Sequence, residues 1–266
     1  MDFIKAFLFG VRDCLLSSCQ TIKLLQRDAN IRSKMAQCFL LNGAVFMCSL
    51  VLFEKIIVPL VLFMTPTETS DWLDITLTTL FRVLWVLPLY LISRLLNVFW
   101  YQEIADLVYK STNKSKPRSL APTISQTIAD IIYSVIVQCV FLIQASVIGI
   151  IPVAGHVLQN VHLSIVYSLY AFEYVWMNQG LGVVKRVAIM HANWAYFTGY
   201  GILMSVIISV SSSYFMGVCL FSLLFPMLIV SSHFTVPQNE IKHTALPLFK
   251  PSVIVTDAIM RLTNRR

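Results

Sequence analysis

The chain has 266 residues, of which 57% are hydrophobic and only 12% charged, and it carries a formal net charge of +7. A soluble domain is about 25% charged, so this composition argues against an ordinary water-soluble protein. Basic residues beside membrane spans set topology and bind anionic lipid headgroups, which accounts for the excess of Lys and Arg. We therefore expect membrane lipids and not nucleic acid as partners.

The first predicted element is an amphipathic helix within residues 1–34. Basic and acidic residues lie between its apolar positions, and the pattern predicts a helix lying in the cytosolic membrane interface. The alternative is a helix that packs on other protein. The apolar positions recur at helical spacing, at Phe3/Ile4, Phe7/Leu8, Val11, Cys14/Leu15 and Ile22.

Two single spans are predicted next, at about residues 39–64 and 75–100. Each contains charge, and a charge inside a span costs several kcal/mol unless it is paired or hydrated. Glu54 and Arg82 should lie at similar depth, so we expect them to pair with each other.

Two longer stretches contain no Asp, Glu, Lys or Arg, namely residues 131–172 and 187–239. Because a span needs about 20 apolar residues, each stretch suits a helix that enters, turns and returns. The predicted arms are 131–154 with 157–178, and 194–210 with 214–231. Their uncharged turns leave open whether the hairpins cross fully or stop inside the membrane.

Connections that contain Lys and Arg alternate along the chain with connections that contain none. Six basic residues lie in 1–34, none in 65–74, four in 101–123, two in 179–193, and none in the hairpin turns. Because excess Lys and Arg marks the cytosolic side, we expect both termini in the cytosol. The predicted parts are an interfacial N-terminal segment (1–34), a polytopic membrane domain (35–232) and a basic cytosolic tail (233–266).

Six polar or charged residues are predicted to lie within the membrane. Arg94, Asp130 and Glu173 share a depth near the cytosolic side, and we expect Glu173 to pair with Arg94. The set forms either a polar cavity or ion path, or structural salt bridges that join helices, and the second interpretation is favoured. Its members are Glu54, Arg82, Arg94, Asn97, Asp130 and Glu173.

The motifs of common enzymes do not occur in this sequence. Its six cysteines form no CxxC pair, and GxSxG, HExxH and Walker patterns are missing. The five histidines show no ligand spacing. We therefore predict a protein that is not an enzyme, with no catalytic residue, metal or cofactor.

Short blocks of sequence point to a known family. They recur in order between about residues 35 and 232, and together they resemble the etoposide-induced endoplasmic reticulum protein family. The blocks are 84–89, Asn97, Trp100, 104–107, 167–170, 172–174, Trp176, Asn178, Gly180, 193–194, 212–214, 219–222 and Pro226.

This resemblance implies an integral endoplasmic reticulum protein needed for autophagic degradation, without catalytic activity. The family is grouped with bacterial CysZ sulfate transporters, whose fold combines long spanning helices with hairpins that penetrate part-way. It implies an all-α, CysZ-like helical bundle with two long spanning helices and two charge-free hairpins. Proteins of the autophagy machinery are the expected protein partners, and the sequence leaves a homo-oligomer open.

Two other functions remain open from the sequence. One is transport of a sulfate-like anion or small solute, and the other is lipid handling, as in a scramblase. Fold kinship is weak evidence for a shared substrate. A hydrated groove lined by Glu54, Arg82, Asn97 and Glu173 would favour transport or lipid movement, whereas a dry, packed interior would favour a scaffold.

Overall fold

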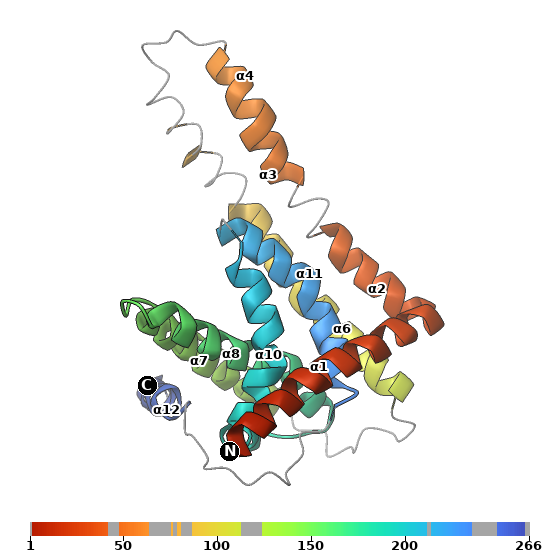
Figure 1. Ribbon diagram of the computed structural model, residues 1–266, viewed down its shortest axis with the longest axis vertical. Helices are drawn as coiled ribbons and strands as arrows, with labels where there is room; N and C mark the ends of the chain where they lie inside the picture. The colour runs from red at the N-terminus through yellow and green to blue at the C-terminus, as the bar shows by residue number, and fades with distance from the viewer. Residues whose placement is uncertain are drawn as a thin grey trace.

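The computed structural model describes residues 2–41, 48–63, 76, 79–80, 87–112, 124–211, 214–235 and 249–263. Every regular element in these ranges is helical (Figure 1), which confirms the predicted all-α class. In chain order the helices are α1 (Asp2–Arg27), α2 (Ala29–Phe39), α3 (Cys48–Leu52), the π-helix η2 (Phe53–Ile57), α4 (Val58–Phe63), α6 (Leu87–Thr112), α7 (Ile124–Gly149), α8 (Gly155–Asn178), α9 (Val183–Ala192), α10 (Trp194–Ser209), α11 (Tyr214–Ser232) and α12 (Lys250–Thr263).

Helix α10 lies at the centre of the bundle, with α8 against one face and α1 across another (Figure 1). Glycines make both contacts possible. A Cβ atom on Gly201 would lie 1.9 Å from the carbonyl oxygen of Ser164 in α8. A Cβ atom on Gly199 would lie 2.0 Å from the carbonyl oxygen of Phe7 in α1. The three helices therefore touch through their backbones.

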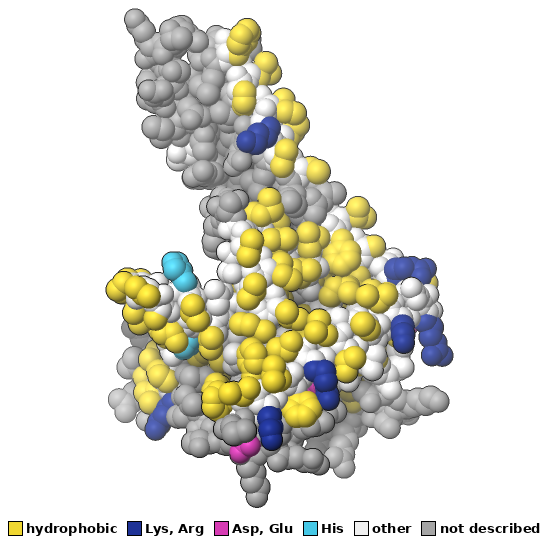
Figure 2. Space-filling model, viewed as in Figure 1, with side chains coloured by type: hydrophobic (Ala, Val, Ile, Leu, Met, Phe, Trp, Pro, Cys, Tyr) yellow, Lys and Arg dark blue, Asp and Glu magenta, His cyan; other side chains and the backbone are white. Residues whose placement is uncertain are grey.

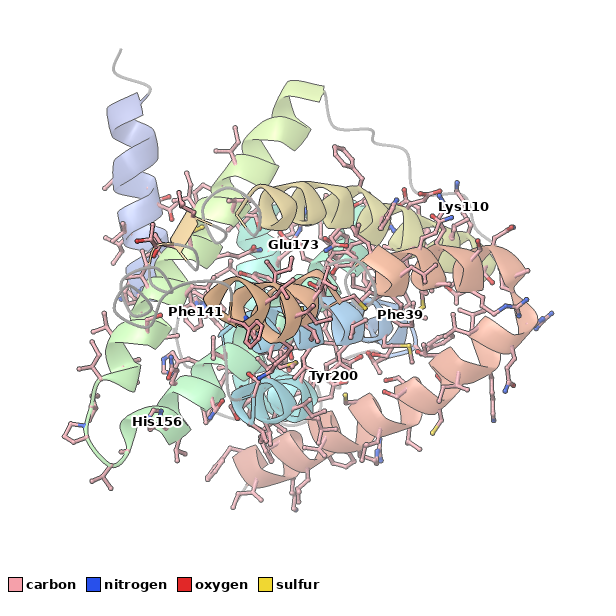
Figure 3. All side chains as sticks on the ribbon, turned by 90° about the horizontal axis from the view of Figure 1, so that it is seen from above. Phe39, Lys110, Phe141, His156, Glu173 and Tyr200 are labelled. Atoms are coloured by element: carbon pink, nitrogen blue, oxygen red, sulfur yellow. The ribbon has the colours of Figure 1, made fainter. Side chains whose placement is uncertain are left out.

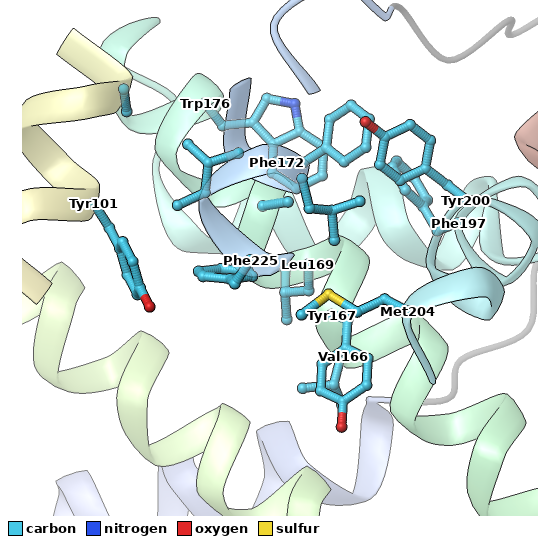
Figure 4. Packing of buried hydrophobic residues seen from close by; sticks show 14 of the residues in the cluster. Tyr101, Val166, Tyr167, Leu169, Phe172, Trp176, Phe197, Tyr200, Met204 and Phe225 are labelled. Carbon is cyan, nitrogen blue, oxygen red and sulfur yellow. The ribbon is translucent and has the colours of Figure 1, made fainter. Parts of the chain in front are cut away.

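Aromatic side chains fill the space beside these crossings. Phe172 of α8 is fully buried, and its ring centroid lies 5.6 Å from that of Trp176, 5.1 Å from that of Phe197 and 4.9 Å from that of Tyr200 (Figure 4). The contacts to Phe197 and Tyr200 are edge-to-face, a geometry that aromatic pairs prefer. This cluster joins α8 to α10.

The N-terminal segment is helical as predicted, and it is also part of the bundle. The fully buried positions of α1 are small residues, whereas several of its large apolar side chains, among them Leu8 and Leu15, are exposed. The boundary predicted between residues 34 and 35 falls inside α2, where Met35 is buried and Lys34 forms an ion pair of 2.8 Å with Glu103 of α6. The buried residues of α1 are Ala6, Gly10, Cys14, Ser17 and Thr21.

Each charge-free stretch contains a pair of helices. α7 and α8 are joined by the turn at residues 150–154, in which Val153 is fully exposed and has a positive φ of 67°. In the second stretch, α10 ends at Ser209 and α11 begins at Tyr214. Residues 212–213 lie outside the described ranges.

Among the described helices, one is long and apolar enough to cross a membrane by length and composition, over Ile132–Gly149. The segments Trp194–Ser209 and Cys219–Ser232 are apolar but shorter. Parts of the predicted spans 39–64 and 75–100 lie outside the described residues. The two long spanning helices thus stay a prediction.

The C-terminal segment is also attached to the bundle. Helix α12 packs on α7, and the buried ring of Phe249 stacks on Phe141 with 4.1 Å between centroids. The backbone N–H of Phe249 donates a hydrogen bond to Nε2 of His191 at 3.0 Å. Residues 249–263 are therefore docked, and residues 236–248 lie outside the described part.

Candidate functional site: the polar cluster around Glu173

Of the six polar candidates, Glu173 is the one whose side-chain contacts the structure gives in detail. It lies on α8 near the centre of the bundle (Figure 3) and faces α7 and α9. Ser134 and Gln138 are four residues apart on α7, so one turn of helix presents both to the carboxylate. Arg186 reaches the same carboxylate from α9. These four side chains form the Glu173 cluster.

Both carboxylate oxygens accept hydrogen bonds. Oε1 accepts from the hydroxyl of Ser134 and from Nη1 of Arg186 at 3.2 Å. Oε2 accepts from Nε2 of Gln138 at 2.5 Å. The side chains of Arg186 and Glu173 are only 7% and 14% exposed, so the ion pair is largely shielded from solvent.

The end of α8 places Arg186. Gly180 has a φ of +72°, the left-handed conformation that glycine adopts without a Cβ penalty. The N–H of Leu181 then donates to the carbonyl of Trp176 at 2.9 Å, and that of Gly180 to Met177 at 2.9 Å, which closes a Schellman motif. The turn directs the carbonyl of Leu181 toward Arg186, whose Nε donates to it at 2.6 Å.

The cluster therefore holds helices together. A buried charge pair is tolerated when further hydrogen bonds satisfy its remaining donors and acceptors, and here Ser134, Gln138 and the Leu181 carbonyl do so. The bonds fix α7 to α8 and α8 to α9. Within the described residues, no three His, Cys, Asp or Glu side chains are grouped to hold a metal ion.

The structure places the other predicted residues as follows. Asn97 is buried on α6. Glu54 in η2, Arg94 in α6 and Asp130 in α7 lie on described helices, but their side chains are outside the described set. Arg82 lies wholly outside the described ranges, so the Glu54–Arg82 pair remains a prediction.

Glu173 is paired, and the partner that the structure shows is Arg186. The predicted contact with Arg94 stays a prediction, because the Arg94 side chain is outside the described set. Ser134, Gln138 and Arg186 were absent from the predicted set. Two polar residues four apart in a charge-free apolar stretch are the signal that marks Ser134 and Gln138.

Comparison with known proteins identifies relatives of this chain. The family model described as "Sulfate transporter CysZ/Etoposide-induced protein 2.4" matches residues 19–226. The chain is 27% identical to "Protein EI24 homolog" of Arabidopsis thaliana over 88% of this chain and 84% of the relative. It is 25% identical to the protein of the same name from Dictyostelium discoideum, over 98% and 85%.

A third relative covers less of the chain. "Ectopic P granules protein 4" of Caenorhabditis elegans is 28% identical over 56% of this chain and 47% of its own length. No solved structure matches the chain. The family match covers more than half of the sequence, so the chain belongs to the sulfate transporter CysZ/etoposide-induced protein 2.4 family.

Proposed function

We propose that this chain is an integral membrane protein of the endoplasmic reticulum, with both termini in the cytosol, that acts without catalysis in autophagic degradation. Family membership and the resemblance of the blocks between residues 35 and 232 support the autophagy assignment. The alternation of basic and non-basic connections supports the orientation. Proteins of the autophagy machinery are the proposed partners.

The tip of the α7–α8 hairpin supports a location in lipid. Ile150, Ile151 and Val153 are exposed there. Hydrocarbon offers no water to hydrogen-bond the backbone, so a turn inside it must satisfy its own polar groups. Four of the five N–H groups at the described residues 150–155 donate to carbonyls of the chain at 2.8–3.2 Å, those of Ile150, Ile151, Ala154 and Gly155, while that of Val153 does not. We propose that this hairpin ends within the membrane.

The observation that favours a scaffold over a transporter is the closed Glu173 cluster. A transported anion needs a cationic group that it can reach and leave. Arg186 is buried, and it already binds Glu173 and the Leu181 carbonyl. The family description also names a sulfate transporter, which makes anion transport the second candidate.

Two measurements separate these functions. Cells lacking the protein should accumulate autophagic cargo, and expression of the wild-type chain should restore clearance. Purified protein in liposomes should pass sulfate no faster than liposomes without protein. Sulfate flux well above that background would contradict the scaffold and support the transporter.

Lipid handling is tested in the same liposomes. Fluorescent phospholipid in the inner leaflet is protected from a reductant added outside unless it is moved across the bilayer. We expect the protected fraction to equal that of protein-free liposomes. Full loss of protection would favour a scramblase.

A further inference from the structure

Helix α1 presents three distinct faces. The small residues Ala6, Gly10, Cys14, Ser17 and Thr21 form the buried face. At 100° per residue, an apolar stripe lies about 135° around the helix from that face, and a basic edge about 90° beyond the stripe. The stripe consists of Ile4, Leu8, Leu15 and Ile22, whose side chains are 50–58% exposed. The basic edge consists of Lys5, Arg12, Lys23 and Arg27, all exposed.

The rotation of α1 is fixed by its contacts with α10. A Cβ atom on Gly10 would lie 2.0 Å from the carbonyl oxygen of Tyr196, so any other residue would force the helices apart. The hydroxyl of Tyr196 also donates to Oδ2 of Asp13 at 3.1 Å. α1 therefore cannot turn to bury its apolar stripe in the bundle without losing these contacts.

The stripe continues a wider apolar surface. Figure 2 shows hydrophobic side chains across the middle of this face, with basic side chains along its lower and right-hand margins, where α1 runs in Figure 1. On the neighbouring helix α10, Val206 and Ile207 are also exposed. An apolar surface bordered by positive charge is the arrangement expected where a protein meets the headgroup layer.

We propose that α1 is a binding surface for anionic lipid, with its stripe in the outer acyl region and its basic edge on headgroup phosphates of the cytosolic leaflet. This inference rests on the proposed membrane function. Lys5, Lys23 and Arg27 would contact the phosphates. Arg12 contributes less, because it bonds to Asp13 at 2.9 Å and stacks on Phe9.

Charge complementarity selects the lipid over another copy of this chain. A second α1 would bring the same positive edge to the contact. A leaflet containing phosphatidylserine supplies the opposite charge, and it covers the stripe with acyl chains. Each basic residue near such a surface raises the affinity about fivefold.

The depth of α1 is measured on the full chain reconstituted in liposomes. The exposed Cys19, Cys48 and Cys139 are first replaced by serine. A fluorescent probe is then attached to a new cysteine at Leu8→Cys, which lies on the stripe. The control carries the probe at Gln20→Cys, an exposed position away from the stripe. The Leu8 probe should be quenched by lipids brominated in the acyl chain, and the Gln20 probe by aqueous iodide. Quenching of both by iodide, or protection of the Leu8 probe from both quenchers, would overturn the proposal.

Lipid preference is measured with the same Leu8 probe. Brominated phosphatidylserine should quench it more than brominated phosphatidylcholine does. Replacing Lys5, Lys23 and Arg27 by glutamine should abolish that preference, whereas replacing the exposed Lys110 and Lys185 by glutamine should not. An unchanged preference in the triple variant would overturn the role of the basic edge.

Resistance of the protein to alkaline carbonate extraction reports membrane integration separately. A chain that resists extraction but fails the probe tests would refute this inference while leaving the proposed membrane protein intact. Release by carbonate would refute the proposed membrane protein itself.

Discussion

Helix α8 meets its neighbours in two different ways. Toward α7 and α9 the junction is polar, because the Glu173 cluster joins three helices by hydrogen bonds and an ion pair. Toward α10 the junction is a backbone contact, at which Gly201 lies directly against Ser164. The polar junction depends on a carboxylate that meets hydrogen-bond donors and a guanidinium. The glycine junction depends on the lack of a side chain at Gly201.

This difference predicts how each junction tolerates change. Buried ion pairs can be replaced by apolar residues of similar volume at little cost, whereas loss of one partner is expensive. A glycine against backbone has no such replacement, because neither backbone can move without displacing its helix. The glycine junction should therefore be the stricter of the two.

The largest effect is expected for Gly201→Leu. Its Cβ would already lie 1.9 Å from a backbone oxygen, and the remaining side-chain atoms have no space. The cost should exceed the about 1–3 kcal/mol typical of overpacked cores, so we expect little folded protein. Size-exclusion chromatography of the detergent-solubilised chain measures this.

The matched comparison is Gly217→Ala against Gly201→Ala, because each adds only a Cβ atom. The Cβ of Gly217→Ala would lie 3.0 Å from the hydroxyl oxygen of Ser211, which is a side-chain atom and not backbone. Alanine also favours a helix over glycine by about 0.5–1 kcal/mol. For Gly217→Ala we expect unchanged or slightly higher stability, and a loss as severe as that of Gly201→Ala would refute the distinction.

The next largest loss of stability is expected for Glu173→Gln. The change leaves the buried guanidinium of Arg186 without its carboxylate, which typically costs about 3–5 kcal/mol. Thermal unfolding in detergent should show a clearly lower midpoint. The partly exposed Lys34–Glu103 pair provides the control, since Glu103→Gln should cost about 0–1 kcal/mol. Equal shifts in the two variants would contradict the structural role of Glu173.

The smallest predicted effect is a pH dependence of α12 docking. Burial lowers the pKa of His191 below its usual 6.5, and its Nε2 accepts the hydrogen bond from Phe249. As pH falls, His191 binds a proton in the unfolded chain before it does so in the folded chain. The stabilisation from neutral, buried His191 is therefore complete above about pH 6.5 and is lost as pH falls through the lowered pKa. Protease protection of α12 should decline with acidification, and less so in His191→Phe. An identical decline in both would exclude His191 as the cause.

Much of the fold follows from the sequence, because charge and apolar length are strong local signals. The stretch 131–172 predicts a helical pair, and the structure has α7 and α8 on either side of residues 150–154. The amphipathic pattern predicts a helix at α1. Its contact face was not predictable from hydrophobicity, because that face is made of small residues that pack by close approach.

The candidate site was only partly predictable. An isolated acid in an apolar region marks Glu173 as costly and in need of a partner. Its partner Arg186 depends on the turn after α8, a geometry set by Gly180 and visible only once the chain is folded. Depth along a predicted span cannot resolve which of two arginines on different helices faces the carboxylate.

The most direct test of a structural Glu173 cluster is a variant in which Glu173→Leu and Arg186→Met remove both charges together. Abundance and autophagic cargo clearance are measured in the same cells, which lack the endogenous protein. Because the costly charges disappear as a pair, abundance should recover well above that of Glu173→Gln, and clearance per molecule should equal that of the wild type. Full abundance with lost clearance would contradict the account and make Glu173 and Arg186 functional residues.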